Sequence, residues 1–261
     1  MKIINYEDID FKSLNKLSHQ GLYSTLYRNE DICFKILDGL FPHEKKSLYK
    51  KFLEMDGIHI DGVLFPLALI VKDNELYGYV MNYFNNSQSL YSKFSTDIVD
   101  CKELFIYLTR ASEILRNLHE NKIIYKDLNF GNILVNNDGD VVFGDLDGCC
   151  YKDYTTLFIS AILNRFFKYR EENILITENL DRISMLLSLI YLLYCQELQE
   201  ISKLKYRSLS QYINTLENLK KYNYLLLNKL KNIPEIPYLD ELIDKNDDYV
   251  LDRNKNLYIK I

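Results

Sequence analysis

The chain has 261 residues, 48% of them hydrophobic, and a formal net charge of −5. This length supports one large domain or two small lobes that share a cleft. The acidic balance leaves no basic footprint for nucleic acid, so we expect no nucleic-acid partner. The five cysteines lack zinc-type spacing and fit reduced thiols, and the N-terminus turns acidic at once without a secretory signal. These features together favour a cytoplasmic protein.

Short apolar runs separated by polar turns predict strands in the first third of the chain. Residues 32–37 form an apolar strand that carries one cation, Lys35. A buried lysine is costly without a partner, although the two-residue alternation of a strand also permits an outward-facing lysine. A helix with one apolar face is expected at 43–55. Residues 63–71 and 76–84 then form two strands joined by a polar turn.

The middle of the chain predicts a long helix followed by a hairpin. Residues 101–119 repeat apolar side chains at helical spacing. Residues 133–135 and 141–143 are apolar and flank an Asn-Asp-Gly turn, which folds one stretch back on the other. This brings Asn132 and Asp145 to the same end of the hairpin, where their oxygens suit Mg²⁺. A hairpin with ordinary surface acids is the alternative.

The last third of the chain is expected to be mainly helical. Apolar residues within 149–180 predict a helix, and residues 181–193 form a nearly continuous apolar helix. The latter is shorter than the roughly 20 residues that cross a bilayer, so we expect a buried core helix and no transmembrane segment. Residues 196–232 are amphipathic and helical. A C-terminal tail begins at about 233 and includes a polar loop at 244–248.

The segment from Asp127 to Asp145 resembles the protein-kinase superfamily, in a divergent, bacterial-type form of the serine/threonine kinases. In that family an Asp orients or deprotonates the substrate hydroxyl, and an Asn five residues later binds metal. An Asp-Phe-Gly metal-binding triplet follows after a hairpin. Asp127 matches the catalytic Asp, Asn132 the metal Asn, and Asp145-Leu146-Asp147 the triplet. The resemblance implies catalysis at Asp127 and Mg²⁺ held by Asn132 and Asp145.

The resemblance also implies a site for the ATP phosphates in the first part of the chain. Lys35 matches the phosphate-binding lysine. Its expected partner is a glutamate on the next helix, and we favour Glu44 slightly over Glu54. Gly21 and Ser24 match two of the three glycine positions of the phosphate-binding loop, so only one of the three glycines is present.

Further matches concern the adenine base and the support of the catalytic loop. Met81 would lie behind the adenine, and the backbone of Asn82, Tyr83 and Phe84 would hydrogen-bond the base. A plain core strand explains the composition of this run equally well. Asp181 resembles the acid at the start of the central helix, which hydrogen-bonds the backbone of the catalytic loop.

Three departures from the family pattern bear on function. Lys126 replaces the arginine before the catalytic Asp and lacks its bidentate fork. Asn129 stands where a lysine usually contacts the transferred phosphate; as a catalytic residue it can still donate a hydrogen bond. No Ala-Pro-Glu occurs in 149–180, which puts the usual peptide-docking platform in doubt.

From the resemblance we expect an α+β, bilobal protein kinase-like fold in one domain, 1–261. A small β-rich N-lobe would span 1–82, and a larger helical C-lobe would span 83–261. The expected function is an ATP- and Mg²⁺-dependent phosphotransferase that moves the γ-phosphate to a serine or threonine hydroxyl. Two alternatives stay open: a small-molecule phosphotransferase of the same superfamily, and a pseudokinase that binds nucleotide or partners. The expected partners are a nucleotide and a protein or small-molecule hydroxyl substrate.

Overall fold

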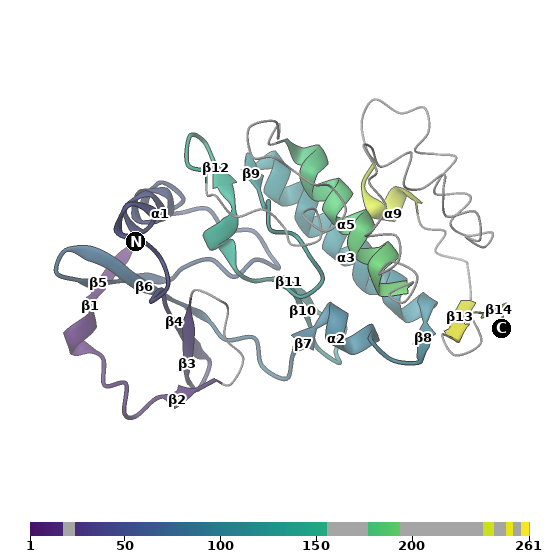
Figure 1. The fold of residues 1–261 in the computed structure, drawn as a ribbon, viewed down its shortest axis with the longest axis horizontal. Coiled ribbons are helices and arrows are strands. Elements are labelled where there is room, and N and C mark those ends of the chain that lie inside the picture. The colour runs from purple at the N-terminus through teal and green to yellow at the C-terminus, as the bar shows by residue number, and fades with distance from the viewer. Residues whose placement is uncertain (18–23, 156–176, 194–236, 243–248, 253–256, 261) are drawn as a thin grey trace.

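A computed structural model describes most of the chain as a mixed α+β structure with a six-stranded sheet (Figure 1). The described residues are 1–17, 24–155, 177–193, 237–242, 249–252 and 257–260. The sheet and helix α1 (Pro42–Glu54) lie at the end that carries the N-terminus, and α3 (Cys101–Glu120) and α5 (Glu178–Leu193) lie towards the other end. The helices predicted within 149–180 and 196–232 fall largely or wholly outside the described residues, as does the polar loop at 244–248.

The six-stranded sheet has the order β1-β5-β6-β4-β3-β2. Its strands are β1 (Lys2–Asn5), β2 (Asn15–Lys16), β3 (Thr25–Asn29), β4 (Ile32–Ile36), β5 (Ala68–Lys72) and β6 (Glu75–Asn82). Only β1 pairs in parallel, with β5, and the other neighbours are antiparallel. Asp73 and Asn74 join β5 to β6 with φ of 52° and 63°, the backbone that a tight two-residue hairpin requires.

The strand predicted at 63–71 begins only at Ala68. Residues before it instead join the loop after α1 to the hairpin of the helical half. Leu64 donates its N–H to the Phe143 carbonyl at 2.9 Å, and Phe143 donates to the Gly62 carbonyl at 2.7 Å. These residues satisfy their backbone groups against the hairpin and not in the sheet, which explains the shorter β5.

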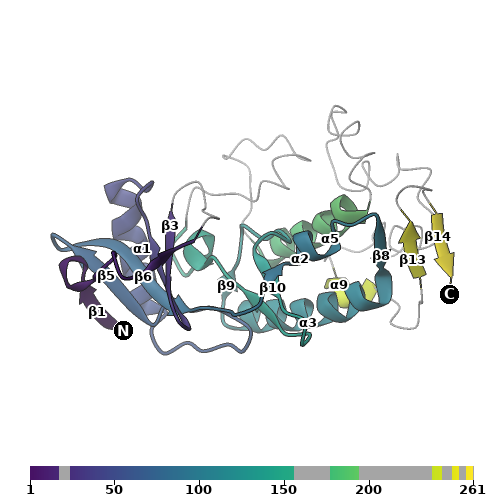
Figure 2. The same ribbon diagram turned by 90° about the horizontal axis from the view of Figure 1, so that it is seen from below.

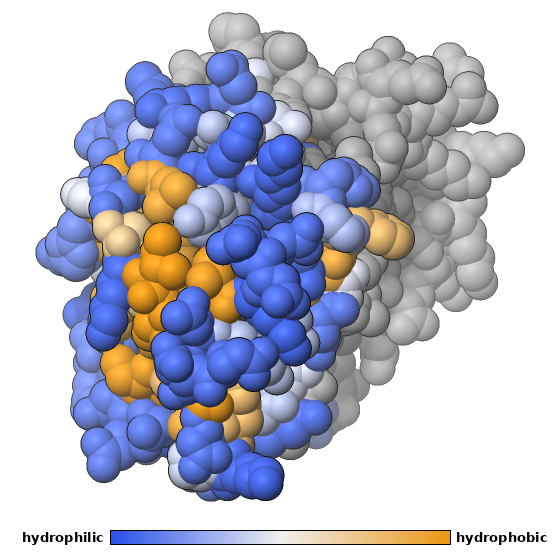
Figure 3. All heavy atoms as spheres, turned by 90° about the vertical axis from the view of Figure 1, so that its left-hand side faces the viewer, coloured by the Kyte–Doolittle hydropathy of each residue, from blue (hydrophilic) through white to orange (hydrophobic). Residues whose placement is uncertain are grey.

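Helix α1 covers one face of the sheet, as its apolar pattern predicted. Leu48 and Phe52 are buried, and the Phe52 ring lies against Tyr79 of β6 with 5.1 Å between ring centroids. Pro42 is the first helical residue, where its missing N–H costs nothing. The opposite face of the sheet buries Ile36, Ala68, Ile70 and Val80 beneath aromatic side chains. Figure 3 views this end of the molecule, where apolar side chains are interspersed among polar ones.

Helix α3 forms the centre of the helical half, with Leu104, Leu108, Leu115 and Leu118 fully buried. Helix α9 (Leu239–Leu242) packs beside it, and Arg116 of α3 forms two hydrogen bonds with Asp240, at 2.9 and 2.7 Å. The tail expected after 233 therefore contributes to this packing. None of the helices among the described residues has the length and apolar character needed to span a bilayer.

Short strands complete the helical half. The predicted hairpin is present as β10 (Ile133–Val135) and β11 (Val141–Phe143), with Ile133 opposite Phe143 and Gly139 at φ 86° in the turn. Other pairs lie around it and at the C-terminal end (Figure 2). These strands are β7 (Gln88–Ser89), β8 (Ile98–Asp100), β9 (Ile123–Ile124), β12 (Cys150–Tyr151), β13 (Tyr249–Asp252) and β14 (Leu257–Lys260); a short helix, α2 (Leu90–Phe94), follows β7.

Candidate active site

The chain turns sharply where β11 ends, and this turn presents two acids to the sheet. Asp145 has φ 55° and ψ 54°, in the left-handed region that Asp tolerates better than most residues. One turn of 3-10 helix, η2 (Leu146–Gly148), follows at once. Unusual backbone of this kind costs about 1–3 kcal/mol and is common at functional sites. The two carboxylates at this turn are those of Asp145 and Asp147.

Both carboxylates meet Lys35 of β4. The Lys35 ammonium forms an ion pair with Asp145 Oδ1 and lies 2.7 Å from Asp147 Oδ2. The Tyr79 hydroxyl donates a hydrogen bond to the other oxygen of Asp147. Lys35 and Tyr79 are opposite each other in the antiparallel pair of β4 and β6, so strand register brings both to Asp147. Lys35 is thus buried and paired, and does not face outward as the alternative reading allowed.

The charges in this cluster shift one another's ionisation. Burial alone would lower the pKa of Lys35, but the two carboxylates outweigh it and raise the pKa above its usual value. Burial would raise the pKa of Asp147, but Lys35 and the Tyr79 hydrogen bond lower it overall. Burial and the charge of Asp147 raise the pKa of Asp145, against the opposing effect of Lys35. Asp147 is therefore the more firmly ionised of the two acids.

The predicted partners of Lys35 were wrong: neither Glu44 nor Glu54 contacts it. Glu44 accepts the Phe41 N–H at 2.8 Å and caps the start of α1. Glu54 lies at the other end of the helix, 2.9 Å from the Lys152 ammonium. The physical reason is that the turn of α1 that faces the site carries a lysine and not an acid.

That lysine is Lys51, whose side chain is buried. Its ammonium donates hydrogen bonds to the carbonyls of Leu146, Asp147 and Cys149, at 3.1, 2.7 and 2.8 Å. An ammonium has three N–H donors, so these contacts use all of them. Sequence reasoning missed this residue. It lies three positions after buried Leu48, and this spacing on a helix was the available signal.

Asp127 and Asn132 lie together beside this cluster. The Asn132 side-chain amide donates to the Asp127 carbonyl at 2.9 Å and contacts its carboxylate at 3.3 Å. The Asn132 carbonyl in turn accepts the Gly144 N–H at 3.2 Å, which ties the loop to the residue before Asp145. Burial and the negative charge of Asp145 raise the pKa of Asp127 to about 6, although Asn132 and Lys35 act against this.

Asn129 shapes the loop between these two residues. Its amide donates to the Asp127 carbonyl at 3.2 Å, and its side-chain oxygen accepts the Gly131 N–H at 2.8 Å. Short Asn side chains often bond the backbone two residues away in this manner. Its predicted contact with a transferred phosphate stays a prediction.

Asp181 holds the start of the loop, as the resemblance implied. Its fully buried carboxylate accepts the backbone N–H groups of Tyr125 and Lys126, at 2.6 and 2.7 Å. His119 of α3 lies 3.0 Å from the same carboxylate and 2.8 Å from the Tyr238 hydroxyl. Lys126 has a φ of 64°, so the anchored backbone is bent immediately before Asp127. His119 supports this anchor through its contact with the Asp181 carboxylate.

The residues predicted for adenine and for the phosphate loop have mixed outcomes. Met81 is largely buried at the end of β6. The Tyr83 N–H donates to the Asp31 carbonyl at 2.7 Å, so its expected bond to the base is not available in this structure, because β-type pairing continues past β6. The backbone roles of Asn82 and Phe84 stay predictions. Ser24 is buried just before β3, and Gly21 lies outside the described residues.

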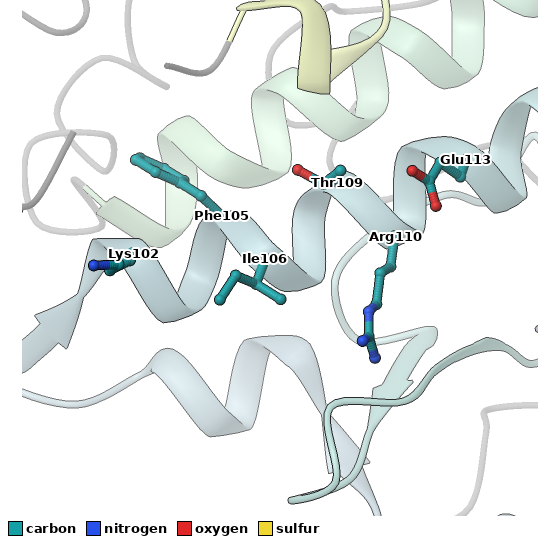
Figure 4. Close-up of a pocket in the computed structure, with 6 residues that line it drawn as sticks. All are labelled: Lys102, Phe105, Ile106, Thr109, Arg110 and Glu113. Atoms are coloured by element: carbon teal, nitrogen blue, oxygen red, sulfur yellow. The ribbon is translucent and has the colours of Figure 1, made fainter. Parts of the chain in front are cut away.

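A separate pocket lies on helix α3 (Figure 4). Arg110 extends from it towards the β10–β11 turn, where it donates to the Gly139 carbonyl. All of the described lining residues belong to α3: Lys102, Phe105, Ile106, Thr109, Arg110 and Glu113. None of them belongs to the Lys35 cluster. Within the described ranges, no three His, Cys, Asp or Glu side chains are grouped to hold a metal by themselves.

Comparison with protein-family models gave no match, and comparison with curated proteins gave none either.

Proposed function

We propose that this protein is an ATP- and Mg²⁺-dependent phosphotransferase that transfers the γ-phosphate to a hydroxyl, as serine/threonine protein kinases do. One observation carries the proposal. Lys35, Asp127, Asn132 and Asp145 come from three separate segments and form two contacting pairs, Lys35 with Asp145 and Asn132 with Asp127. The Asn132 carbonyl links the pairs by accepting the N–H of Gly144, the residue before Asp145. In this proposal the sheet with α1 is the small lobe of a bilobal kinase-like fold, and the helical half is the large lobe.

The side chains present fit a magnesium ion. Both contacts of Asn132 with Asp127 use the amide nitrogen, so the amide oxygen is directed away from Asp127. The Asp145 side chain is 42% exposed, which allows its carboxylate to reach a ligand. Hard oxygen donors of these two types are the ligands that Mg²⁺ prefers. When bound, the ion would neutralise charge on the phosphates.

Each remaining residue has a proposed part. Lys35 contacts the ATP phosphates as a point charge. Asp127 orients the acceptor hydroxyl and takes its proton. The pKa of this carboxylate is about 6, so it is mainly ionised at neutral pH, and its pKa lies near enough to neutral pH for efficient proton transfer. The backbone of Asn82 and Phe84 receives the adenine. The kind of acceptor, protein or small molecule, is decided by the assay below.

One observation favours a second candidate, a nucleotide-binding module without transfer activity. Both polar atoms of the Asn129 side chain bond the loop backbone, so this residue offers less to a transferred phosphate than a lysine would. Retention of Lys35, Asp127, Asn132 and Asp145 together favours the enzyme, because a binding module has no need of Asp127.

The test is Asp145→Ala, with Asp138→Ala in the exposed β10–β11 turn as the matched control. We expect the parent and the control to bind ATP in a Mg²⁺-dependent manner in calorimetry, and to transfer label from γ-labelled ATP to protein or small-molecule hydroxyls. Asp145→Ala should lose both and stay folded, with a melting temperature lowered by the strain of alanine at φ 55° and by the lost ion pair with Lys35. Transfer at the parent rate by Asp145→Ala would refute the assignment. Binding without transfer in the parent would establish the binding module.

A further inference from the structure

We propose that Asp147 is a positioning residue: it is the permanent counter-ion of Lys35 and holds the lysine ammonium in place. Asp145 is then left to hold the metal. The inference rests on the proposed function and divides the work of the two acids. In the kinase pattern a glutamate on the helix after the lysine strand holds the lysine; here the acid comes from the third position of the triplet.

The contacts of the two acids differ in the way this division requires. The Asp147 side chain is only 14% exposed, against 42% for Asp145. Asp147 uses both carboxylate oxygens within the protein: one lies 2.7 Å from Lys35, and the other accepts the Tyr79 hydroxyl. Unpairing a buried carboxylate held this way is strongly unfavourable. Among the described residues the Asp145 carboxylate forms an ion pair with Lys35 alone, and its greater exposure allows it to turn towards an incoming ion.

Helix α1 cannot supply the counter-ion because it supplies a cation to the same place. The Lys51 ammonium bonds the carbonyls of Leu146, Asp147 and Cys149 and so fixes the backbone of η2. With that backbone fixed, the Asp147 side chain is held towards Lys35. Glu44 and Glu54 are engaged at the two ends of the helix, at its cap and with Lys152.

The first experiment needs no nucleotide. Unfolding is measured for Lys35→Met, Asp147→Asn and the double variant, and the cycle is repeated with Glu54→Gln in place of Asp147→Asn. We expect the two effects at Lys35 and Asp147 to depart from additivity by about tenfold in the unfolding equilibrium constant, and the Glu54 cycle to be additive within about twofold. Additive effects at Lys35 and Asp147 would overturn the proposal. If Lys35→Met does not fold, Lys35→Gln, which keeps a donor, takes its place.

The second experiment separates positioning from a general structural role. Binding of Mg²⁺-ATP and of adenosine is measured for the parent, Asp147→Asn and Glu54→Gln. We expect Asp147→Asn to bind ATP about tenfold more weakly, the scale of one charge-assisted contact, and adenosine within twofold of the parent. Glu54→Gln should behave as the parent does. Asp147→Glu, which keeps the charge, should recover part of the loss.

The outcomes distinguish this inference from the proposed function. If the parent binds no Mg²⁺-ATP, the proposed function fails, and the unfolding cycle still decides whether Asp147 holds Lys35. If the parent binds ATP but Asp147→Asn binds it equally well, the proposed function stands and the assignment of Asp147 is wrong. Equal losses of ATP and adenosine would mean that Asp147 supports the fold and not the position of Lys35.

Discussion

Replacing Lys51 with methionine tests the buried contact between α1 and the turn after Asp145. Methionine keeps an unbranched side chain of similar length, so the packing beside Leu48 and Phe52 changes little. The substitution removes the ammonium and leaves the three carbonyls of Leu146, Asp147 and Cys149 without this donor.

The size of the effect follows from these contacts. A hydrogen bond that involves a charged group contributes about 1.5–3 kcal/mol net, so three independent bonds would represent roughly 5–9 kcal/mol. These three bonds share one ammonium, so their contributions do not add in full. A net loss of about 2–4 kcal/mol remains. For a chain of this size that corresponds to a fall in melting temperature of about 5–15 °C.

The assay is thermal unfolding followed by circular dichroism, with Lys50→Met as the control. Lys50 precedes Lys51 on the same helix and is exposed, so the control makes the same chemical change without breaking these bonds. We expect the control to melt within about 2 °C of the parent, the scale of a surface change. If Lys51→Met melts with the control, the three carbonyl contacts do not stabilise the fold and the reasoning is refuted.

Two further predictions concern Asp127 and Asp181. Because the pKa of Asp127 is raised from 3.8 to about 6, the folded metal-free protein binds more protons than the unfolded chain in that window, and its stability falls as the pH rises through it. Asp127→Asn should remove this slope in melting temperatures measured from pH 4 to 7 and stabilise the metal-free protein at pH 7 by about 1–3 kcal/mol. It should also lower turnover about 10²–10⁴-fold while the affinity for Mg²⁺-ATP stays unchanged. An unchanged pH slope, or a loss of affinity equal to the loss of turnover, would contradict this. The Asp181 carboxylate accepts two backbone N–H groups, and Asp181→Asn leaves the side chain with only one acceptor atom. The substitution should lower the free energy of unfolding in urea by about 3 kcal/mol. A variant as stable as the parent would show that the anchor is dispensable.

The secondary structure of the described residues could largely be predicted because the signals were local. The apolar runs at 32–37 and 101–119 correspond to β4 and α3, and the Asn-Asp-Gly turn to the β10–β11 hairpin. The predicted helix at 181–193 begins three residues earlier, at Glu178. Its apolar side chains marked the buried face but not the helix cap. The strand predicted to begin at residue 63 is absent before Ala68, because an apolar run does not indicate which partner its backbone will pair with.

The candidate site could be predicted in part. The hairpin between Asn132 and Asp145 indicated that these two residues lie together, and the resemblance to the kinase motif indicated Asp127. The partner of Lys35 could not be found in this way. Any counter-ion from α1 or from the turn satisfies the same sequence pattern, and only the three-dimensional register of β4, β6 and η2 selects Asp147. The resemblance pointed to a glutamate on α1, but the buried α1 side chain that reaches the turn is that of Lys51.

The charges of the site explain why Lys51 and Asp147 belong together. Two ammonium groups, Lys35 and Lys51, lie with two carboxylates, Asp145 and Asp147, so these four charges sum to zero before any ligand binds, and Asp127 beside them adds a negative charge when it is ionised. A glutamate at 51 beside these acids would set three carboxylates against one ammonium, which a poorly hydrated interior does not tolerate. A glycine at 147 would leave Asp145 as the carboxylate partner of Lys35, so a metal held by Asp145 under the proposed function would compete with Lys35 for it. Asp147 therefore offsets the charge that Lys51 brings to the turn, and under the proposed function it keeps Lys35 paired when Asp145 binds a ligand.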